Sequence, residues 1–145
     1  MFGRWSRRRR AAARPEPRPP VERFTASYEP ELDGDPDPGE VVWVWIPYED
    51  DPHQGKDRPV VVVGRAADDL VVVPLTTKPH PERDDEIEVG RGGWDRTGRI
   101  SYAKVDDVLH VKAGEVRREG AILDRPRFDA VVAGVAAYRA RHPGR

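Results

Sequence analysis

Polar residues that could bind a phosphate group stand at the ends of valine-rich segments. Arg58 directly precedes one such segment, and Thr76 directly follows the next. A guanidinium holds phosphate oxygens through two hydrogen bonds and a threonine hydroxyl donates one more, so the pair has the chemistry of a phosphate site. From the residues alone, two structural roles also remain open: Arg58 can pair with Asp57 or Glu40, and Thr77 can cap a turn.

Other kinds of catalytic site find no support in the sequence. The chain has no Cys, which excludes a thiolate nucleophile, a disulfide and cysteine-bound zinc, and suits a reducing cytoplasm. Its four His lack the short spacings of a metal site, and the glycines form neither a P-loop nor a dinucleotide-binding pattern. We therefore expect a cytoplasmic protein with no metal and no cofactor.

The segments that must position Arg58 and Thr76 have the composition of β-strands. The four consecutive valines at 60–63 predict a strand that is buried on both faces. Short connections favour an antiparallel meander, in which the start of the second strand and the end of the third lie at the same end of the sheet. Arg58 and Thr76 are therefore expected to be neighbours. The predicted strands are 40–46, 59–64, 70–75, 86–89, 99–105 and 108–111.

The C-terminal residues change to a helical period. Asp124 is placed to cap a helix that has Pro126 in its first turn. The apolar stripe of this helix would cover an open face of the sheet, and it consists of Phe128, Val131, Val132, Val135 and Tyr138. The predicted fold class is therefore mainly β: a small antiparallel barrel with a C-terminal helix.

The N-terminal residues differ in composition from the rest of the chain. Of the 145 residues, the first 20 carry seven Arg and one Glu, and residues 1–38 are rich in Pro and then in acidic residues. Such a segment buries too little apolar surface to fold, so we predict a disordered tail at 1–38 and one domain at 39–142. The tail is either a solvated extension or an arm that attracts nucleic acid. The longest apolar runs, 41–47 and 130–138, are too short to span a bilayer.

Four blocks of the sequence, in order, resemble the MazF/PemK toxins of type II toxin–antitoxin systems. The similarity extends from about residue 39 to residue 128. Its most specific part is an Arg-Pro pair that opens one valine-rich strand together with a Pro-x-Thr motif that closes the next. The blocks are GEVVWV at 39–44, QGKDRPVVVV at 54–63, VVVPLTT at 71–77 and KVDDV at 104–108.

The resemblance implies an SH3-like β-barrel, a homodimer and a metal-independent endoribonuclease that cuts single-stranded RNA. In that family the substrate's own 2′-hydroxyl attacks the phosphate, and a 2′,3′-cyclic phosphate is left. Carried over by position, it implies that Arg58 stabilises the phosphorane charge and that Thr76 holds a non-bridging oxygen. It also implies that Asp106 acts as a base assisted by Lys104. The implied partner is an antitoxin that fills the RNA groove.

Residues near these positions are candidates for RNA contacts. Trp94, in a glycine-rich loop, is a candidate for stacking on bases. Trp43 and Trp45 are expected on one side of a strand, either buried against the helix or a partner subunit or stacked on bases. The remaining candidates are Lys56, Thr77 and Lys78.

Two other functions stay open at the level of sequence. One is a catalytically silent barrel of the same family that binds RNA, DNA or a protein through the same groove. The other is an adaptor whose basic, Pro-rich tail recruits nucleic acid or a partner that binds polyproline II.

Overall fold

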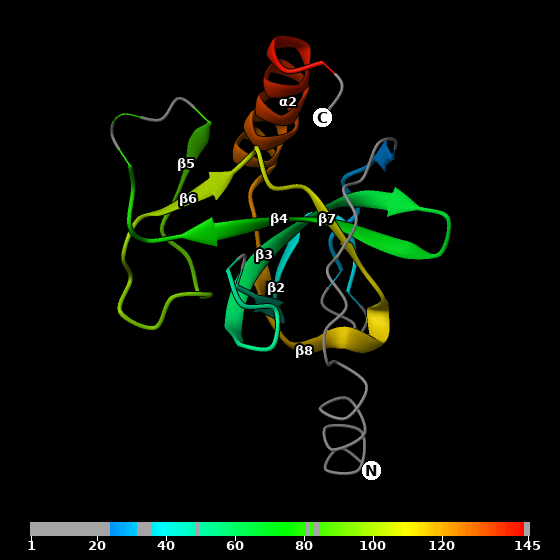
Figure 1. Cartoon of the computed structure of the whole chain (residues 1–145). Coiled ribbons are helices and arrows are strands. Elements are labelled where there is room, and N and C mark those ends of the chain that lie inside the picture. Colours follow the sequence, from blue (N-terminus) through cyan, green and yellow to red (C-terminus); the bar gives the residue numbers. More distant parts are fainter. Residues whose placement is uncertain (1–23, 32–35, 49, 81, 83–84, 144–145) are drawn as a thin grey trace.

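Eight strands and one C-terminal helix make up the described part of the chain (Figure 1). The structure is a computed structural model, and it describes residues 24–31, 36–48, 50–80, 82 and 85–143. The elements are β1 (Thr25–Ala26), β2 (Glu40–Pro47), β3 (Gly55–Ala66), β4 (Asp69–Thr76), β5 (Glu86–Gly90), β6 (Ser101–Lys104), β7 (Leu109–Val111), the 3-10 turn η1 (Ala113–Glu115), β8 (Val116–Ile122) and α2 (Arg125–Arg141).

The predicted antiparallel meander is confirmed. β2 pairs with β3 and β3 pairs with β4, all antiparallel. The sheet runs in the order β5-β6-β4-β3-β2-β8, with β1 added on β3 and β7 added on β4. The strands curl into a half-barrel, so the mainly β fold class with one C-terminal helix is also confirmed.

The central strands are buried on both faces, as the valine runs predict. Residues 60–63 are fully buried and alternate between two hydrophobic cores on opposite sides of β3. One core is enclosed by β2, β3, β4, β7 and β8 and contains Val60 and Val62. The other contains Val61 and Val63 and lies beneath the helix. Period-two alternation accounts for both sets, because successive side chains of a strand point to opposite faces.

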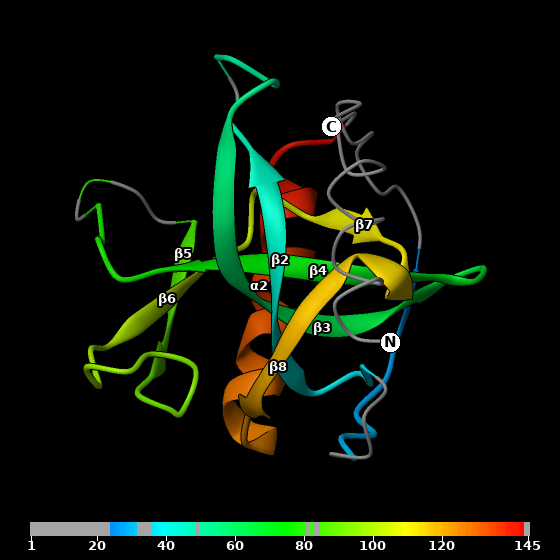
Figure 2. The same ribbon diagram turned by 90° about the horizontal axis from the view of Figure 1, so that it is seen from below.

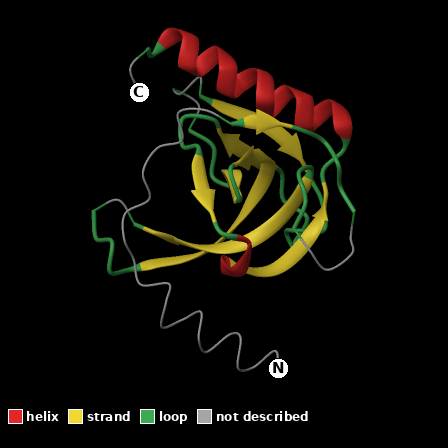
Figure 3. Cartoon of the chain, turned by 90° about the vertical axis from the view of Figure 1, so that its right-hand side faces the viewer, coloured by secondary structure: helices red, strands yellow, loops and turns green. Residues whose placement is uncertain are grey.

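Helix α2 closes the second core, lying along one side of the strands (Figure 3). Asp124 is its N-cap, since the carboxylate accepts a hydrogen bond from the Arg127 amide at 3.1 Å. Phe128, Val131 and Val135 are buried against the sheet. The predicted cap and apolar stripe are therefore confirmed. No helix in the described part of the chain is both long and apolar enough to cross a membrane.

Residues 24–31 contact the sheet and the helix, within the stretch 1–38 for which the sequence predicts a disordered tail. Thr25 and Ala26 form β1, paired with Arg65 and Gly64 of β3. Gly64 permits this pairing, because a Cβ at that position would collide with the carbonyl of Thr25. The Tyr28 hydroxyl donates a hydrogen bond to the Leu123 carbonyl at 2.8 Å, and the centroids of the Tyr28 and Phe128 rings lie 5.0 Å apart. Few apolar residues therefore suffice to anchor this segment. Residues 1–23 lie outside the described part.

Strand β4 changes partner partway along its length. It pairs with β3 up to Val60 and Pro74, and from Leu75 onward it pairs with β6. Figure 2 shows β4 running toward β5 and β6, while the beginning of β3 stays with β2. Proline supplies no amide hydrogen for a further ladder bond, which fits a change of partner at Pro74. The two strands therefore part next to Arg58 and Thr76.

Candidate active site

A pocket of about 410 Å³ lies where β3 and β4 part. Strand ends and loops from four regions of the chain contribute to it. The lining residues come from β2 (Trp43), from β3 (Lys56, Asp57, Arg58 and Pro59), from β4 and the residues after it (Leu75, Thr76, Thr77, Lys78 and His80), and from the 91–100 loop with β6 (Trp94, Asp95, Arg99, Ser101 and Lys104).

The pocket brings together most of the residues that the sequence proposed for a site. Arg58 and Thr76 both line it, from opposite sides of the gap between β3 and β4. The β3–β4 register pairs Val60 with Pro74, so Arg58 and Thr76 fall at matching positions two residues further along. The other proposed residues that line the pocket are Lys56, Thr77, Lys78, Trp94 and Lys104.

Asp106 is the proposed catalytic residue that the structure does not bring to this pocket. It follows β6 in the turn where the Asp107 amide donates to the Lys104 carbonyl at 3.0 Å. Lys104 is the last residue of β6 and lines the pocket, whereas Asp106 is not among the lining residues. A turn directly after the strand redirects the chain between the two residues.

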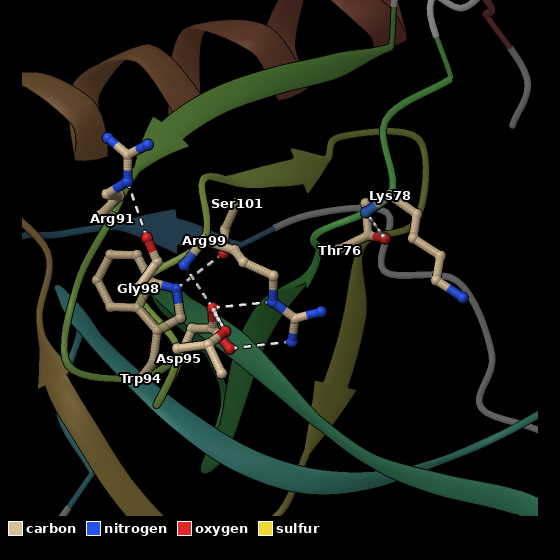
Figure 4. Close-up of polar contacts among 9 residues, drawn as sticks. Thr76, Lys78, Arg91, Trp94, Asp95, Gly98, Arg99 and Ser101 are labelled. Atoms are coloured by element: carbon tan, nitrogen blue, oxygen red, sulfur yellow. Dashed lines mark hydrogen bonds and ion pairs between the residues drawn. The ribbon is translucent and has the colours of Figure 1, made fainter.

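The Thr76 hydroxyl is oriented by a turn. Its Oγ1 accepts a hydrogen bond from the Lys78 amide at 3.1 Å (Figure 4). The hydroxyl proton is not used in this contact, so it can be donated to a ligand oxygen in the pocket. Thr76 therefore has the turn-capping role that was considered for Thr77. This contact fixes the Thr76 Oγ1 and leaves its hydroxyl proton available to a ligand.

Cations gather in the pocket at an electrostatic cost. Lys56 and Arg58 are two residues apart on β3 and thus share one face of the strand. The nearby Arg58 guanidinium, then partial burial, then the Lys78 ammonium lower the pKa of Lys56. The Lys56 ammonium therefore lies within the field of the Arg58 and Lys78 charges, and a bound anion would relieve this repulsion.

The two carboxylates considered as partners of Arg58 have other contacts. Asp57 lies 3.4 Å from the Arg117 Nε of β8, so the alternative that it pairs with Arg58 is not realised. The buried Glu40, the other alternative partner, accepts a hydrogen bond from the Glu31 amide at 2.9 Å. Among the described lining residues, five are Lys or Arg and two are Asp. The pocket therefore carries an excess of positive charge.

Asp95 holds the 91–100 loop in shape at the rim of the pocket. Hydrogen bonds from the side chain and then the backbone amide of Arg99 lower the pKa of Asp95 to about 2. The amide bond is 2.6 Å, and Arg99 adds side-chain contacts at 3.1 and 3.2 Å (Figure 4). Arg99 is thus a pocket cation that sequence reasoning missed, because only the folded loop brings it to the rim.

Trp94, the candidate for stacking on bases, lines the pocket but is almost completely covered. The residue is only 4% exposed and belongs to the core beneath the helix. The indole N–H donates to the Ser101 hydroxyl at 3.0 Å (Figure 4). Trp94 therefore forms a wall of the pocket and fixes the loop to β6. Trp43 is half-buried and lines the same pocket, so of the two residues it is the better placed to meet a base.

Comparisons with known proteins identify the family. The sequence model of the PemK-like, MazF-like toxins of type II toxin–antitoxin systems matches residues 37–138. No curated protein matches the sequence at a significant level. Among solved structures, MazF (Form-I) from Deinococcus radiodurans is similar with a TM-score of 0.57 and 17% identity, over 73% of this chain and 97% of that one.

Two further solved structures share the fold. The Mycobacterium tuberculosis toxin MazF-mt6 has a TM-score of 0.52 and 17% identity, over 68% of this chain and 93% of that chain. A MazE-MazF structure (Form-II) from Deinococcus radiodurans has a TM-score of 0.53 and 15% identity, over 72% and 94% of the two chains. Together with the family match over most of the described domain, these findings give the identification: this chain belongs to the PemK-like, MazF-like toxin family of type II toxin–antitoxin systems.

Proposed function

We propose that this protein is a toxin-like endoribonuclease that cleaves single-stranded RNA in the pocket between β3 and β4. The single observation that carries the proposal is the convergence of Arg58 and Thr76 on one cationic pocket. A guanidinium fork and a hydroxyl donor aimed at one space suit a phosphodiester, and the surrounding ammonium groups supply attraction for the neighbouring phosphates.

In this reaction the RNA provides its own nucleophile. The 2′-oxygen attacks the adjacent phosphorus, a bond between them forms, and the bond from phosphorus to the 5′-oxygen breaks. Arg58 stabilises the additional negative charge on the phosphorane oxygens, and Thr76 donates a hydrogen bond to one of them. Lys104 adds positive charge at the same site. The products are a 2′,3′-cyclic phosphate and a 5′-hydroxyl, and the protein needs neither a metal nor a covalent intermediate.

The direct test is cleavage of RNA by the purified full-length protein. Unstructured transcripts that together contain every five-base sequence are incubated with the protein in the presence of a chelator, and new ends are mapped. We expect cuts after a restricted set of sequences, with cyclic-phosphate 3′ ends and hydroxyl 5′ ends. Binding without any new ends would instead support the catalytically silent barrel.

The family also supports two partner proposals. We propose that the protein forms a homodimer and that it binds a cognate antitoxin, in line with the solved MazE-MazF structures of similar fold. An antitoxin segment that occupies the pocket should be acidic, because the pocket is cationic. Co-expression with the protein encoded by the adjacent reading frame, followed by sizing of the complex, tests both points.

Binding of RNA should depend strongly on salt. For single strands the logarithm of affinity falls by about 0.7 per neutralised phosphate for each tenfold rise in salt. Engagement of Lys56, Arg58, Lys78 and Lys104 with four phosphates therefore predicts a slope of about −3 for a 2′-O-methyl oligonucleotide that cannot be cleaved. Replacing Lys78 by Ala should reduce the slope by about 0.7.

A matched control for this titration is Lys112→Ala. Lys112 is exposed, and its Nζ lies 3.2 Å from Asp69 Oδ1. It is not among the described residues that line the pocket. Its replacement should leave the slope unchanged. Equal effects of the two substitutions would show that the RNA does not follow the pocket.

A further inference from the structure

We infer that His80 is the general base of the RNA cleavage proposed above and that Glu86 positions it. This inference rests on the proposed function and extends it, since that function needs a group that accepts the proton of the attacking 2′-hydroxyl. The family resemblance points to Asp106 for that task, but Asp106 is not among the residues that line the pocket. His80 is among them.

The carboxylate of Glu86 holds His80 through two contacts. Its Oε1 accepts a hydrogen bond from the His80 backbone amide at 2.8 Å, and its Oε2 lies 2.9 Å from the His80 Nδ1. The Glu86 side chain is only 4% exposed, whereas that of His80 is 48% exposed. A nearly buried carboxylate on β5 thus contacts both the backbone and the ring of His80, and the ring remains accessible from the pocket.

The contact between Glu86 Oε2 and His80 Nδ1 sets the tautomer of the imidazole. An ionised carboxylate can only accept a hydrogen bond, so the proton of the neutral ring is on Nδ1. The other nitrogen, Nε2, then carries a lone pair and is the atom that can take a proton from a substrate. Histidine is suited to this role because imidazoles as a class exchange protons between about pH 5 and pH 8.

The proton and electron balance of the step is simple. The 2′-hydroxyl proton passes to Nε2 of His80 as the 2′-oxygen bonds to phosphorus. The electron pair of the bond to the 5′-oxygen leaves with that oxygen, which takes a proton from water. The imidazolium that forms is stabilised by the Glu86 carboxylate at Nδ1 and returns its proton to solvent after the reaction.

Charged groups of both signs share the pocket with His80. The charged groups that share the pocket are Lys78 on the same segment, Lys56, Asp57 and Arg58 on β3, Lys104 on β6, and Asp95 and Arg99 on the 91–100 loop.

The test is the pH dependence of single-turnover cleavage by the full-length protein. For the wild type we expect the rate to rise with pH and then to level off, as it does when a step needs a deprotonated base. The His80→Gln variant should cleave at least about 100-fold more slowly and should lose this rising limb. In the His80→Gly variant, added imidazole should restore part of the rate.

Glu86 is a positioning residue, so its test needs a readout beyond the rate alone. The Glu86→Gln variant keeps the shape of the side chain but removes the charge that favours the imidazolium. We expect its plateau rate to fall, because the neutral amide no longer stabilises the imidazolium that forms in the step, and we expect no further fall when His80→Gln is added to it. A purely structural role would add its own loss to that of His80→Gln.

The matched control is His110→Gln. His110 also pairs with a carboxylate, since its Nδ1 lies 2.8 Å from Asp69, but it is on β7 and does not line the pocket. Its replacement should leave rate and pH profile unchanged.

If Arg58→Ala is inactive while His80→Gln keeps the wild-type rate or profile, the inference about His80 is wrong and the proposed function stands. The inference is also wrong if His80→Gln is slowed equally at every pH and added imidazole does not rescue His80→Gly. A wild type that cleaves no RNA overturns both.

Discussion

Replacing Arg58 by Ala is expected to slow RNA cleavage by about 100- to 1000-fold, the range found when a preorganised donor to a developing negative charge is removed. Arg58 lines the pocket from β3, and among the described residues no carboxylate takes up its guanidinium in an ion pair. The substitution removes side-chain atoms at a half-buried position, so the fold should be retained. Single-turnover cleavage measures the first expectation, and the far-ultraviolet circular dichroism spectrum measures the second.

Two companion variants sharpen this prediction. Arg58→Lys keeps the charge but loses the planar fork, so its rate should lie between those of the wild type and Arg58→Ala. Arg65→Ala is the matched control, because Arg65 lies on the same strand and pairs with Asp37 at 3.3 Å, away from the pocket. Its rate should equal that of the wild type. An Arg58→Ala protein that cleaves normally would move the reaction to another part of the molecule.

Replacing Phe128 by Ala is expected to lower the free energy of unfolding by about 3–5 kcal/mol. Phe128 is buried where α2 meets the sheet, and the centroid of its ring lies 5.0 Å from that of the Tyr28 ring. The loss would be a large part of the stability of a small domain, and it corresponds to a fall in melting temperature of about 10–20 °C. Urea unfolding followed by circular dichroism gives the free energy, and thermal unfolding gives the temperature.

The contrast with Phe128→Leu separates packing from other effects. Leucine keeps most of the buried volume, so this variant should lose less than about 1.5 kcal/mol. Tyr28→Phe is a second comparison, because it retains the ring contact and removes only the 2.8 Å hydrogen bond to Leu123. It should cost about 1 kcal/mol. If Phe128→Ala were as stable as these variants, α2 would not be the cover of the core that contains Val61 and Val63.

Much of the fold follows from the sequence because its strands carry strong local signals. The four valines at 60–63 indicate burial on both faces, and the structure places them in two separate cores. The neighbourhood of Arg58 and Thr76 follows from chain direction alone, since an antiparallel pair joined by a short turn must bring those two ends together. The cap at Asp124 likewise depends only on adjacent residues.

Features that depend on distant partners could not be predicted in the same way. Strand β8 contains charged residues and a glycine, and it forms because β2 presents an edge for it to pair with. β1 is two residues long and is held by the space that Gly64 leaves on β3. Trp94 sits in a glycine-rich loop that suggests exposure, but the fold turns its ring into the core. His80 and Glu86 meet only because β5 pairs with β6 beside the end of β4.

The most direct test of the central claim is a crystal structure of the protein with an RNA that has a 2′-deoxy sugar at the cleavage position, so that it binds without reacting. The account predicts that non-bridging oxygens of the scissile phosphate lie within hydrogen-bond distance, about 2.7–3.2 Å, of the Arg58 guanidinium and of the Thr76 hydroxyl. A scissile phosphate bound on another face of the molecule, with the pocket between β3 and β4 holding no part of the RNA, would contradict it.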